Sequence, residues 1–220
     1  MPHGYTNDTT RNGPSVTKVY LGPDATRRCA REAATLTALA EVLPVPPVVA
    51  RDGIRLDLGY LPGTHGQDLI GRGQAGPVLA ACGRMLRRIH AIDPERAGMR
   101  GPHPPGAVLV HGDYGPNNML LDPDAWEVTA VLDWEWAHAG APVEDLAWCE
   151  WIVRMHHPGD IGALGAFFAA YRFRPAWPAR HEAMLARCRA MLDLCERWRP
   201  DEAAVPRWRD RLAITASWAE

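Results

Sequence analysis

The chain has 220 residues, of which 47% are hydrophobic, and a formal net charge of -2 at pH 7. This length and apolar content suit one large domain or two closely packed lobes. The near-neutral charge gives no electrostatic reason to expect nucleic acid or an acidic membrane as a partner. The five cysteines lack a C-x-x-C spacing and indicate neither a disulfide framework nor a zinc site. No leader pattern and no run of about 18 apolar residues occurs, so we expect a cytoplasmic protein.

The first part of the chain predicts a strand followed by a helix. Residues Ser15–Tyr20 combine β-branched, aromatic and polar side chains, which is typical of a strand. Gly22-Pro23-Asp24 predicts a turn. Apolar residues at three- and four-residue spacing then predict a helix from Ala25 to Leu43, which Pro44 ends.

A hairpin and a link come next. The hairpin has predicted strands over residues 44–50 and 54–58. The glycine- and proline-containing segment 59–63 after it predicts a loop. We therefore expect two units, an N-terminal lobe of residues 1–60 and a C-terminal lobe of residues 61–220.

The remainder of the chain is mostly helical in pattern. Apolar residues between positions 78 and 89 predict a helix that ends before Asp93-Pro94. A turn over residues 120–124 separates two predicted strands. Further helices are expected over residues 143–156, 160–173 and 180–198. The arginines from Arg187 to Arg211 alternate with acidic residues, which favours a solvated helical face over an anion site.

Two acidic motifs follow short apolar runs in the middle of the chain. The first runs from His111 to Asn118 and contains Asp113, and the second contains Asp133. A carboxylate in a short loop can orient and deprotonate a hydroxyl group, while an amide oxygen and a second carboxylate hold magnesium against nucleotide phosphates. Magnesium prefers such oxygen ligands. The spacing therefore favours a phosphoryl-transfer centre with Asp113 as the base and Asn118 and Asp133 as metal ligands.

Lysine is nearly absent from the chain. Of the 24 lysine and arginine residues, Lys18 alone is lysine. A general bias toward arginine is one explanation. The other is that position 18 needs a compact ammonium against phosphate oxygens, where a planar guanidinium is a poor substitute. Glu32 on the predicted helix is the candidate partner of Lys18, with a surface pair between Glu32 and Arg28 as the alternative.

The order of these motifs resembles the aminoglycoside phosphotransferase and choline kinase family, whose members are related to protein kinases. The resemblance rests on His111, Gly112, Asp113 and Asn118, on Asp133, Trp134 and Glu135, and on Gly140 and Asp145-Leu146-Ala147. Four elements in one order are more specific than any one of them. The resemblance implies an α+β, two-lobed, protein-kinase-like fold, with a small N-terminal antiparallel sheet plus a helix and a larger, mostly helical C-terminal lobe.

The resemblance also implies roles for the residues that match. Asp113 would accept the proton of the substrate hydroxyl, and Lys18, held by Glu32, would contact the phosphates of ATP or GTP. Asn118 and Asp133 would hold Mg²⁺. The nucleoside triphosphate and a small hydroxylated molecule would be the partners of this site.

Other matching positions would support the site. Backbone groups near Leu58, Tyr60 and Leu61 would meet the adenine ring. His111 would pack beneath the catalytic loop, and Asp145 would accept hydrogen bonds from its backbone. Glu135 would either assist metal or substrate binding through water or pair with a nearby cation, and the sequence leaves these two roles open.

The implied activity is transfer of the γ-phosphate to a hydroxyl of an aminoglycoside-like antibiotic or a related hydroxylated metabolite, and antibiotic resistance is one context for it. A polycationic acceptor needs an acidic cleft. The candidate carboxylates are Glu135, Glu144, Glu150 and Asp160. The family's glycine-rich phosphate loop is reduced here to residues 4–8, so the strand before it is expected to be short or missing.

Two alternatives follow from the same residues. One is a kinase-like nucleotide-binding protein without transferase activity, which the reduced phosphate loop favours and the complete set of polar site residues opposes. The other is a metal-dependent hydrolase that uses His111, Asp113 and the pair His156-His157. Because His156-His157-Pro158 reads as a helix end, and neighbouring side chains on a helix point apart, the hydrolase is the weaker alternative.

Overall fold

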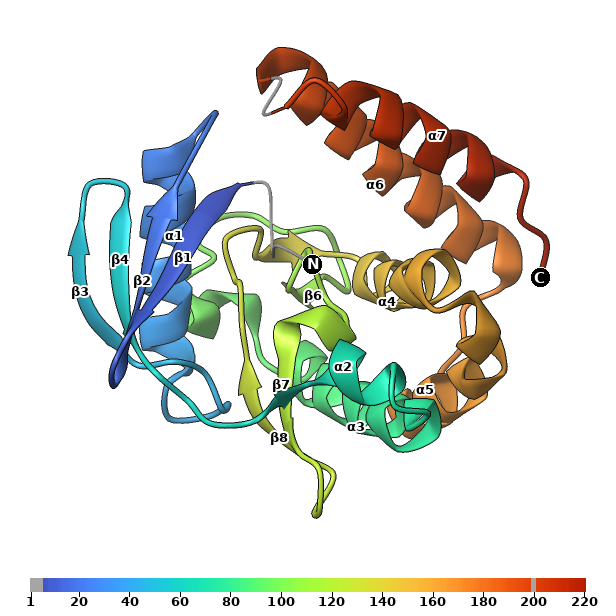
Figure 1. The fold of residues 1–220 in the computed structure, drawn as a ribbon, viewed down its shortest axis with the longest axis horizontal. Coiled ribbons are helices and arrows are strands. Elements are labelled where there is room, and N and C mark those ends of the chain that lie inside the picture. The colour runs from blue at the N-terminus through green and yellow to red at the C-terminus, as the bar shows by residue number, and fades with distance from the viewer. Residues whose placement is uncertain (1–5, 199–200) are drawn as a thin grey trace.

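The structure, a computed structural model, describes residues 6–198 and 201–220. Figure 1 shows a small sheet with one helix beside it, joined to a larger and mostly helical part. This is the predicted two-lobed, protein-kinase-like arrangement. No helix in the described residues is long and apolar enough to cross a membrane.

Four strands and one helix form the described part of the small lobe. They are β1 (Asn7–Asn12), β2 (Ser15–Tyr20), α1 (Ala25–Leu39), β3 (Val48–Asp52) and β4 (Arg55–Gly59). The strands are antiparallel and lie in the order β1-β2-β4-β3, so β2 and β4 are central. The predicted hairpin is confirmed. The helix ends at Leu39 and not at Leu43, because the chain tightens there into turns in which the N–H groups of Val42 and Leu43 both bond to the carbonyl of Leu39.

The expected phosphate loop over residues 4–8 is only partly described. Residues 4 and 5, and the preceding positions at which a strand is expected to be short or missing, lie outside the described residues. Asn7 and Asp8 belong to β1, where they pair with Tyr20 and Val19 of β2. The prediction of a loop at these two positions is therefore wrong.

The larger lobe begins with a short strand and contains two small sheets. Its strands are β5 (Thr64–His65), β6 (Val108–Val110), β7 (Met119–Asp122), β8 (Glu127–Val131) and β9 (His138–Gly140). β5, β7 and β8 form one antiparallel sheet, and β6 pairs with β9 in another. The turn between β7 and β8 covers residues 123–126, so residues 120–122 of the predicted turn belong to β7 instead. The pairing of β6 with β9 brings the chain segments around the two acidic motifs side by side.

Helices make up the remainder of the larger lobe. They are α2 (Gly66–Ile70), α3 (Ala75–His90), α4 (Val143–His156), α5 (Leu164–Tyr171), α6 (Trp177–Trp198) and α7 (Ala204–Ala216). Three short 3-10 helices lie between them, η1 (Pro94–Ala97), η2 (Pro116–Asn118) and η3 (Pro158–Ala163). The helix predicted over residues 160–173 is divided into η3 and α5, and neither α2 nor α7 was predicted.

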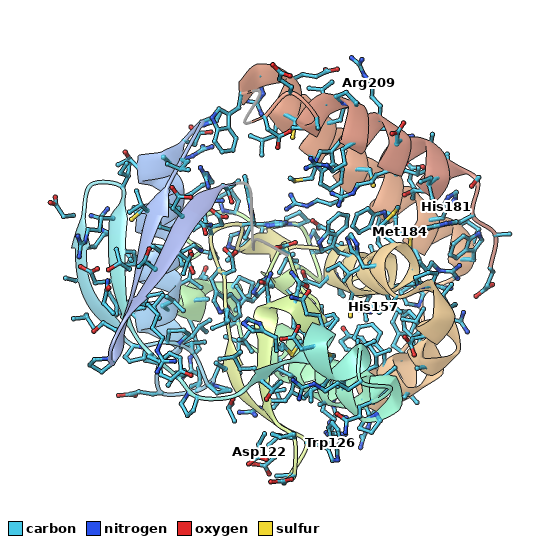
Figure 2. All side chains as sticks on the ribbon, viewed as in Figure 1. Asp122, Trp126, His157, His181, Met184 and Arg209 are labelled. Atoms are coloured by element: carbon cyan, nitrogen blue, oxygen red, sulfur yellow. The ribbon has the colours of Figure 1, made fainter. Side chains whose placement is uncertain are left out.

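Two apolar clusters hold these elements in place. The larger one includes the buried stripe of α3, with Val78, Cys82 and Ile89 at the predicted helical spacing. The second cluster joins α4, α6 and α7, and it contains Trp151 and Met184. Figure 2 labels Met184 at this interface, where the side chain is fully buried. Burial of each large apolar side chain contributes about 1.5–3 kcal/mol, so the second cluster fixes α6 firmly against α4.

The C-terminal end of α6 reaches back to the small lobe. Gly22, in the turn between β2 and α1, has a φ of +74°, and a Cβ atom at this position would approach the Trp198 ring to 2.4 Å. Glycine is therefore needed at this position for close approach and for backbone conformation. The contact links the last long helices to the lobe that carries Lys18.

Candidate active site

The loop that carries the first acidic motif is held from below by a buried carboxylate. Asp145, in the first turn of α4, accepts hydrogen bonds from the backbone N–H groups of His111 (2.8 Å) and Gly112 (2.9 Å). His90 at the end of α3 contacts the same carboxylate at 3.1 Å. Burial alone raises the pKa of Asp145, but the hydrogen bonds and charges around it outweigh burial and lower the pKa overall. Asp145 therefore accepts hydrogen bonds from the backbone of the catalytic loop, as the resemblance implies.

His111 and Gly112 shape the loop. The His111 ring is buried, its Nε2 lies 2.8 Å from the carbonyl oxygen of Leu132, and its Nδ1 accepts the N–H of Asp113 at 3.2 Å. These contacts give His111 the predicted supporting position. Gly112 has a φ of +84°, and a Cβ atom there would lie 2.7 Å from the carbonyl oxygen of Trp136. Only glycine fits this close approach without displacing the backbone.

Asp113 is oriented by two side-chain donors. Trp148 Nε1 donates to Oδ1 at 2.7 Å, and Asn118 Nδ2 donates to Oδ2 at 2.8 Å. Burial raises the pKa of Asp113 and the neighbouring Asp133 charge raises it further, while Arg187 and the Trp148 hydrogen bond act in the opposite direction. The net result is a pKa above the usual range. A carboxylate with a raised pKa accepts a proton more readily, as a general base requires.

Asn118, in η2, has its amide nitrogen hydrogen-bonded to the loop. Its Nδ2 donates to both the backbone oxygen and Oδ2 of Asp113, each at 2.8 Å. Its Oδ1 accepts no hydrogen bond from the described part of the chain. The fixed amide nitrogen therefore leaves an oxygen donor available at the predicted metal position.

Lys18 lies between two carboxylates from different lobes. Its Nζ is 2.6 Å from Glu32 Oε2 and 2.7 Å from Asp133 Oδ1. Burial would lower the pKa of Lys18, but the charges of Asp133 and Glu32 outweigh this and raise the pKa. Asp133 has a φ of +66°, a left-handed conformation that costs energy and is uncommon for a residue with a side chain. The surrounding contacts hold Asp133 in this conformation, with one carboxylate oxygen on Lys18.

Glu32 is the predicted partner of Lys18, and the alternative pairing with Arg28 is wrong. Glu32 also accepts hydrogen bonds from the Tyr20 hydroxyl and, at 3.2 Å, from the Trp134 backbone N–H. The carboxylate therefore joins β2, α1 and the second acidic motif. Because it is buried and fully engaged, it fixes where the Lys18 ammonium lies.

Arg28 instead pairs with Glu135. The two side chains are buried and in direct contact, and Glu135 also accepts a hydrogen bond from Thr6 Oγ1 at 2.5 Å. Of the two roles left open for Glu135, the structure shows pairing with a cation. Burial and the Asp133 charge raise the pKa of Glu135 to about 7, against the opposing charges of Lys18 and Arg28.

The predicted adenine-binding segment has most of its polar backbone groups engaged. Leu58 is buried and paired with Val16 across the sheet. The Tyr60 N–H donates to the carbonyl of Pro14 at 2.8 Å, and the Arg11 guanidinium lies 3.6 Å from the centre of the Tyr60 ring. No backbone hydrogen bond of Leu61 is found within the described residues. The carbonyl of Tyr60 likewise accepts no backbone hydrogen bond in this part of the structure.

The expected acidic cleft does not form. Glu135 is paired with Arg28, and Glu144 lies 2.9 Å from His138 Nε2. Glu150 is fully buried between two arginines, at 2.7 Å from Arg180 and 3.0 Å from Arg154. Three of the four expected carboxylates are thus neutralised within the protein, so the prediction that they line a cleft for a polycation is wrong. The fourth, Asp160 in η3, forms no salt bridge among the described residues.

Two residues beside Asp113 were not identified from the sequence. Trp148 lies outside the matching motifs, and the charge pattern around Arg187 predicts a solvated helical face. Trp148 follows Asp145 by three positions on α4, and this spacing places both on the face that supports the loop. That spacing was the available signal for Trp148. No comparable signal marks Arg187, which approaches the site only because α6 packs on α4.

A metal held here would have few protein ligands. The described residues contain no group of three or more histidine, cysteine, aspartate or glutamate side chains suited to a metal ion. The hard oxygens of Asn118 and Asp133 fit magnesium, which usually takes one or two carboxylates and completes its shell with waters and phosphates. His156 ends α4 as expected and packs edge-on against Trp151, at 5.7 Å between ring centres.

Comparison with solved structures supports the fold. The aminoglycoside 2'-phosphotransferase-IIIa GDP complex matches with a TM-score of 0.75 and 14% identity, over 97% of this chain and 90% of that chain. The apoenzyme of macrolide 2'-phosphotransferase MphH from Brachybacterium faecium matches with a TM-score of 0.61 and 20% identity, over 99% of this chain and 94% of that chain. Aminoglycoside-3'-phosphotransferase of type VIII matches with a TM-score of 0.65 and 22% identity, over 82% and 87% of the two chains.

Sequence comparison gives the family. A segment of 47 residues is 43% identical to mouse Acyl-CoA dehydrogenase family member 10, which amounts to 21% of this chain and only 4% of that protein. The family model described as "Phosphotransferase enzyme family" matches residues 2–107 and 102–183, which contain both acidic motifs and Lys18. The chain therefore belongs to the phosphotransferase enzyme family and is a phosphotransferase with an alcohol group as acceptor.

Proposed function

We propose that this protein transfers the γ-phosphoryl group of ATP or GTP to a hydroxyl group of a small molecule, with Mg²⁺ as cofactor. The observation that carries the proposal is the set of contacts between Lys18 and both Glu32 and Asp133, together with the hydrogen bond between Asp113 and Asn118. It combines a base, a phosphate-binding cation and oxygen donors for a metal. These are the components of phosphoryl transfer.

Asp113 is the proposed base. The hydroxyl proton passes to its carboxylate as the acceptor oxygen forms a bond to the γ-phosphorus, and the bond from that phosphorus to the β–γ bridging oxygen breaks. A nucleoside diphosphate leaves. Trp148 and Asn118 hold the carboxylate in a fixed orientation during this step, which favours an in-line approach.

Lys18, with its position set by Glu32, would contact the nucleotide phosphates, and Asn118 and Asp133 would hold Mg²⁺. A bound magnesium ion neutralises charge on the phosphates during transfer. Leu58, Tyr60 and Leu61 would border the adenine ring, with the backbone groups of Leu61 and the carbonyl of Tyr60 open to it. We place the boundary between nucleotide-binding and catalytic lobes after residue 60, where β4 has ended.

Calorimetric titration with ATP and with GTP, each with and without magnesium, tests the proposal. We expect magnesium-dependent binding that is weakened in Asp133→Ala. Asp113→Asn should bind nucleotide within about threefold of the wild type but transfer phosphate at least about a hundredfold more slowly, since it lacks the base. Nucleotide affinity that does not depend on magnesium would rule out Asn118 and Asp133 as metal ligands. Undiminished turnover in Asp113→Asn would rule out Asp113 as the base.

A further inference from the structure

Arg187 lies on the side of Asp113 that is formed by α4 and α6. It follows the buried Met184 by three positions, so the two residues share the face of α6 that packs on α4. Its guanidinium carbon is 5.6 Å from the centre of the Trp148 ring and 5.3 Å from that of Trp136. Trp148 in turn donates its hydrogen bond to Asp113. Arg187, Trp148 and Asp113 thus form one continuous contact series.

The guanidinium of Arg187 forms no salt bridge with any carboxylate in the described part of the chain, although the charge of Asp113 acts on it. Within residues 6–198 and 201–220, no hydrogen bond or salt bridge to Arg187 is found, and its Nε is fully buried without a partner. A buried donor without a partner costs about 1–3 kcal/mol. Burial also lowers the pKa of Arg187, even though the charges of Asp113, Asp145 and Glu135 oppose this. The protein therefore keeps the guanidinium of Arg187 at this position even though its burial is energetically unfavourable.

Neighbouring arginines differ from Arg187 in this respect. Arg180, on the same helix, is buried and bonded to Glu150, and the exposed Arg189 is paired with Glu182. Two of the carboxylates whose charges act on Arg187 have other partners, because Asp145 is bonded to the loop backbone and Glu135 is paired with Arg28. An approaching molecule meets an unpaired cation beside the base and no free acidic cleft.

We propose that Arg187 binds a carboxylate or phosphate group on the hydroxylated acceptor, and this rests on the function proposed above. The Trp136 and Trp148 rings position the planar guanidinium by cation–π contacts. Its N–H donors match the two oxygens of a carboxylate or phosphate. The acceptor is therefore a hydroxy acid or a phosphorylated alcohol, and a polycation is disfavoured.

Binding of four compounds built on one carbon skeleton tests the charge preference. Glycerate and glycerol 3-phosphate are anionic, glycerol is neutral, and 2-amino-1,3-propanediol is cationic. Each is titrated into the protein loaded with magnesium and a non-hydrolysable ATP analogue, so that the nucleotide phosphate site is already filled. We expect the anions to bind most tightly, and Arg187→Met to weaken them by at least about tenfold.

Arg189→Met is the matched control, because this residue is exposed and lies on the same helix. It should leave anion binding within about twofold of the wild type. If neither anion binds the wild type, or if both bind Arg187→Met equally well, the proposal is wrong. A lower melting temperature in Arg187→Met with unchanged anion binding would show a purely structural residue.

Kinetics separate an anion on the acceptor from the phosphoryl group in transfer. An acceptor-binding role predicts that Arg187→Met raises KM for the anionic acceptors and leaves KM for glycerol unchanged, measured at a pH well above the raised pKa of Asp113 so that this base stays ionised when the Arg187 charge is lost. If kcat falls for every acceptor, Arg187 acts on the transferring group and the acceptor assignment is wrong. Nucleotide affinity, measured in the same variants, reports separately on the proposed kinase function. If nucleotide does not bind at all, the same anion titrations are run on the nucleotide-free protein, with Lys18→Met to identify anions bound at the phosphate site.

Discussion

Asp113 is the residue whose properties depend most on its neighbours. Two donors orient its carboxylate, and Asp133 and Arg187 act on its charge in opposite directions. Its pKa is above the ordinary range because of burial and the charge of Asp133. A base works only when deprotonated, so activity should fall as pH decreases through this raised pKa.

Trp148→Phe tests the contribution of the tryptophan N–H. Loss of this hydrogen bond destabilises the carboxylate form, so the pKa of Asp113 should rise further, and the acid limb of kcat/KM should move up by about one pH unit. The pH profile is measured for phosphate transfer or for nucleotide hydrolysis by water. Trp151→Phe is the control, because its N–H bonds to Thr215 at 2.8 Å and not to Asp113. An acid limb that shifts equally in both variants would contradict this role.

At the scale of elements, the catalytic loop depends on the first turn of α4. Asp145 connects this turn to two backbone N–H groups of the loop and to His90 of α3. One carboxylate therefore holds three elements in register. Since the pKa of Asp145 is lowered in the folded protein, its contribution to stability is present above the pKa of the unfolded chain and is lost as pH falls through the folded value.

Asp145→Asn should lower the free energy of unfolding by about 3 kcal/mol near neutral pH, because an amide cannot accept all of these hydrogen bonds. The deficit relative to the wild type should shrink in acid. Urea unfolding at several pH values measures both effects. Asp124→Asn, at an exposed position, is the control and should change stability by less than about 0.5 kcal/mol. A deficit that does not depend on pH would contradict the ionised role of Asp145.

Comparison of the predicted and observed elements shows which site residues can be identified from sequence patterns. The strand with Lys18 and the helix with Glu32 were predictable, because alternation and apolar spacing fix which faces meet. Asp145 was identified through its motif. Trp148 was missed because a tryptophan in an apolar helix has the pattern of a core residue, and Arg187 because charge alternation does not reveal which turn of α6 packs on α4. The prediction of an acidic cleft was wrong for a similar reason. Tertiary packing brings cations such as Arg180 against the carboxylates, and the sequence pattern does not show this.

At the scale of the whole molecule, the two lobes are joined by buried polar contacts. Lys18 meets Asp133, Glu32 meets the backbone of Trp134, and Arg28 meets Glu135. Breaking a buried pair by removing one partner costs about 3–5 kcal/mol, because a charge is left alone. These contacts should therefore make the lobes unfold together.

Arg28→Met should destabilise the protein by about 3 kcal/mol well above neutral pH, where the stranded Glu135 is ionised. The pKa of Glu135 is about 7 in the folded protein and higher than in the unfolded chain. Folding therefore favours protonated Glu135 as pH falls, and the cost of the variant should decrease with it. Arg28 holds this pKa down, so in the variant the pKa of Glu135 rises further and the change in cost lies above about pH 7. Denaturation at several pH values from about 6 to about 10 measures this. Arg27→Met changes an exposed neighbour on α1 and should have little effect at any of these pH values; an equal loss in both variants would contradict the bridging role.

The single lysine makes the cleft chemically addressable. Lys18 is 5% exposed, and it carries the only ε-amine in the chain. Acylating reagents require an accessible, unprotonated amine. While the lobes are in contact, burial limits access to Lys18, and the two adjacent carboxylates keep its ammonium group protonated. The extent of ε-amine acylation, counted as added mass on the Lys18 peptide, therefore reports how often the lobes separate. One natural residue thus reports opening of the catalytic cleft without the introduction of a probe residue.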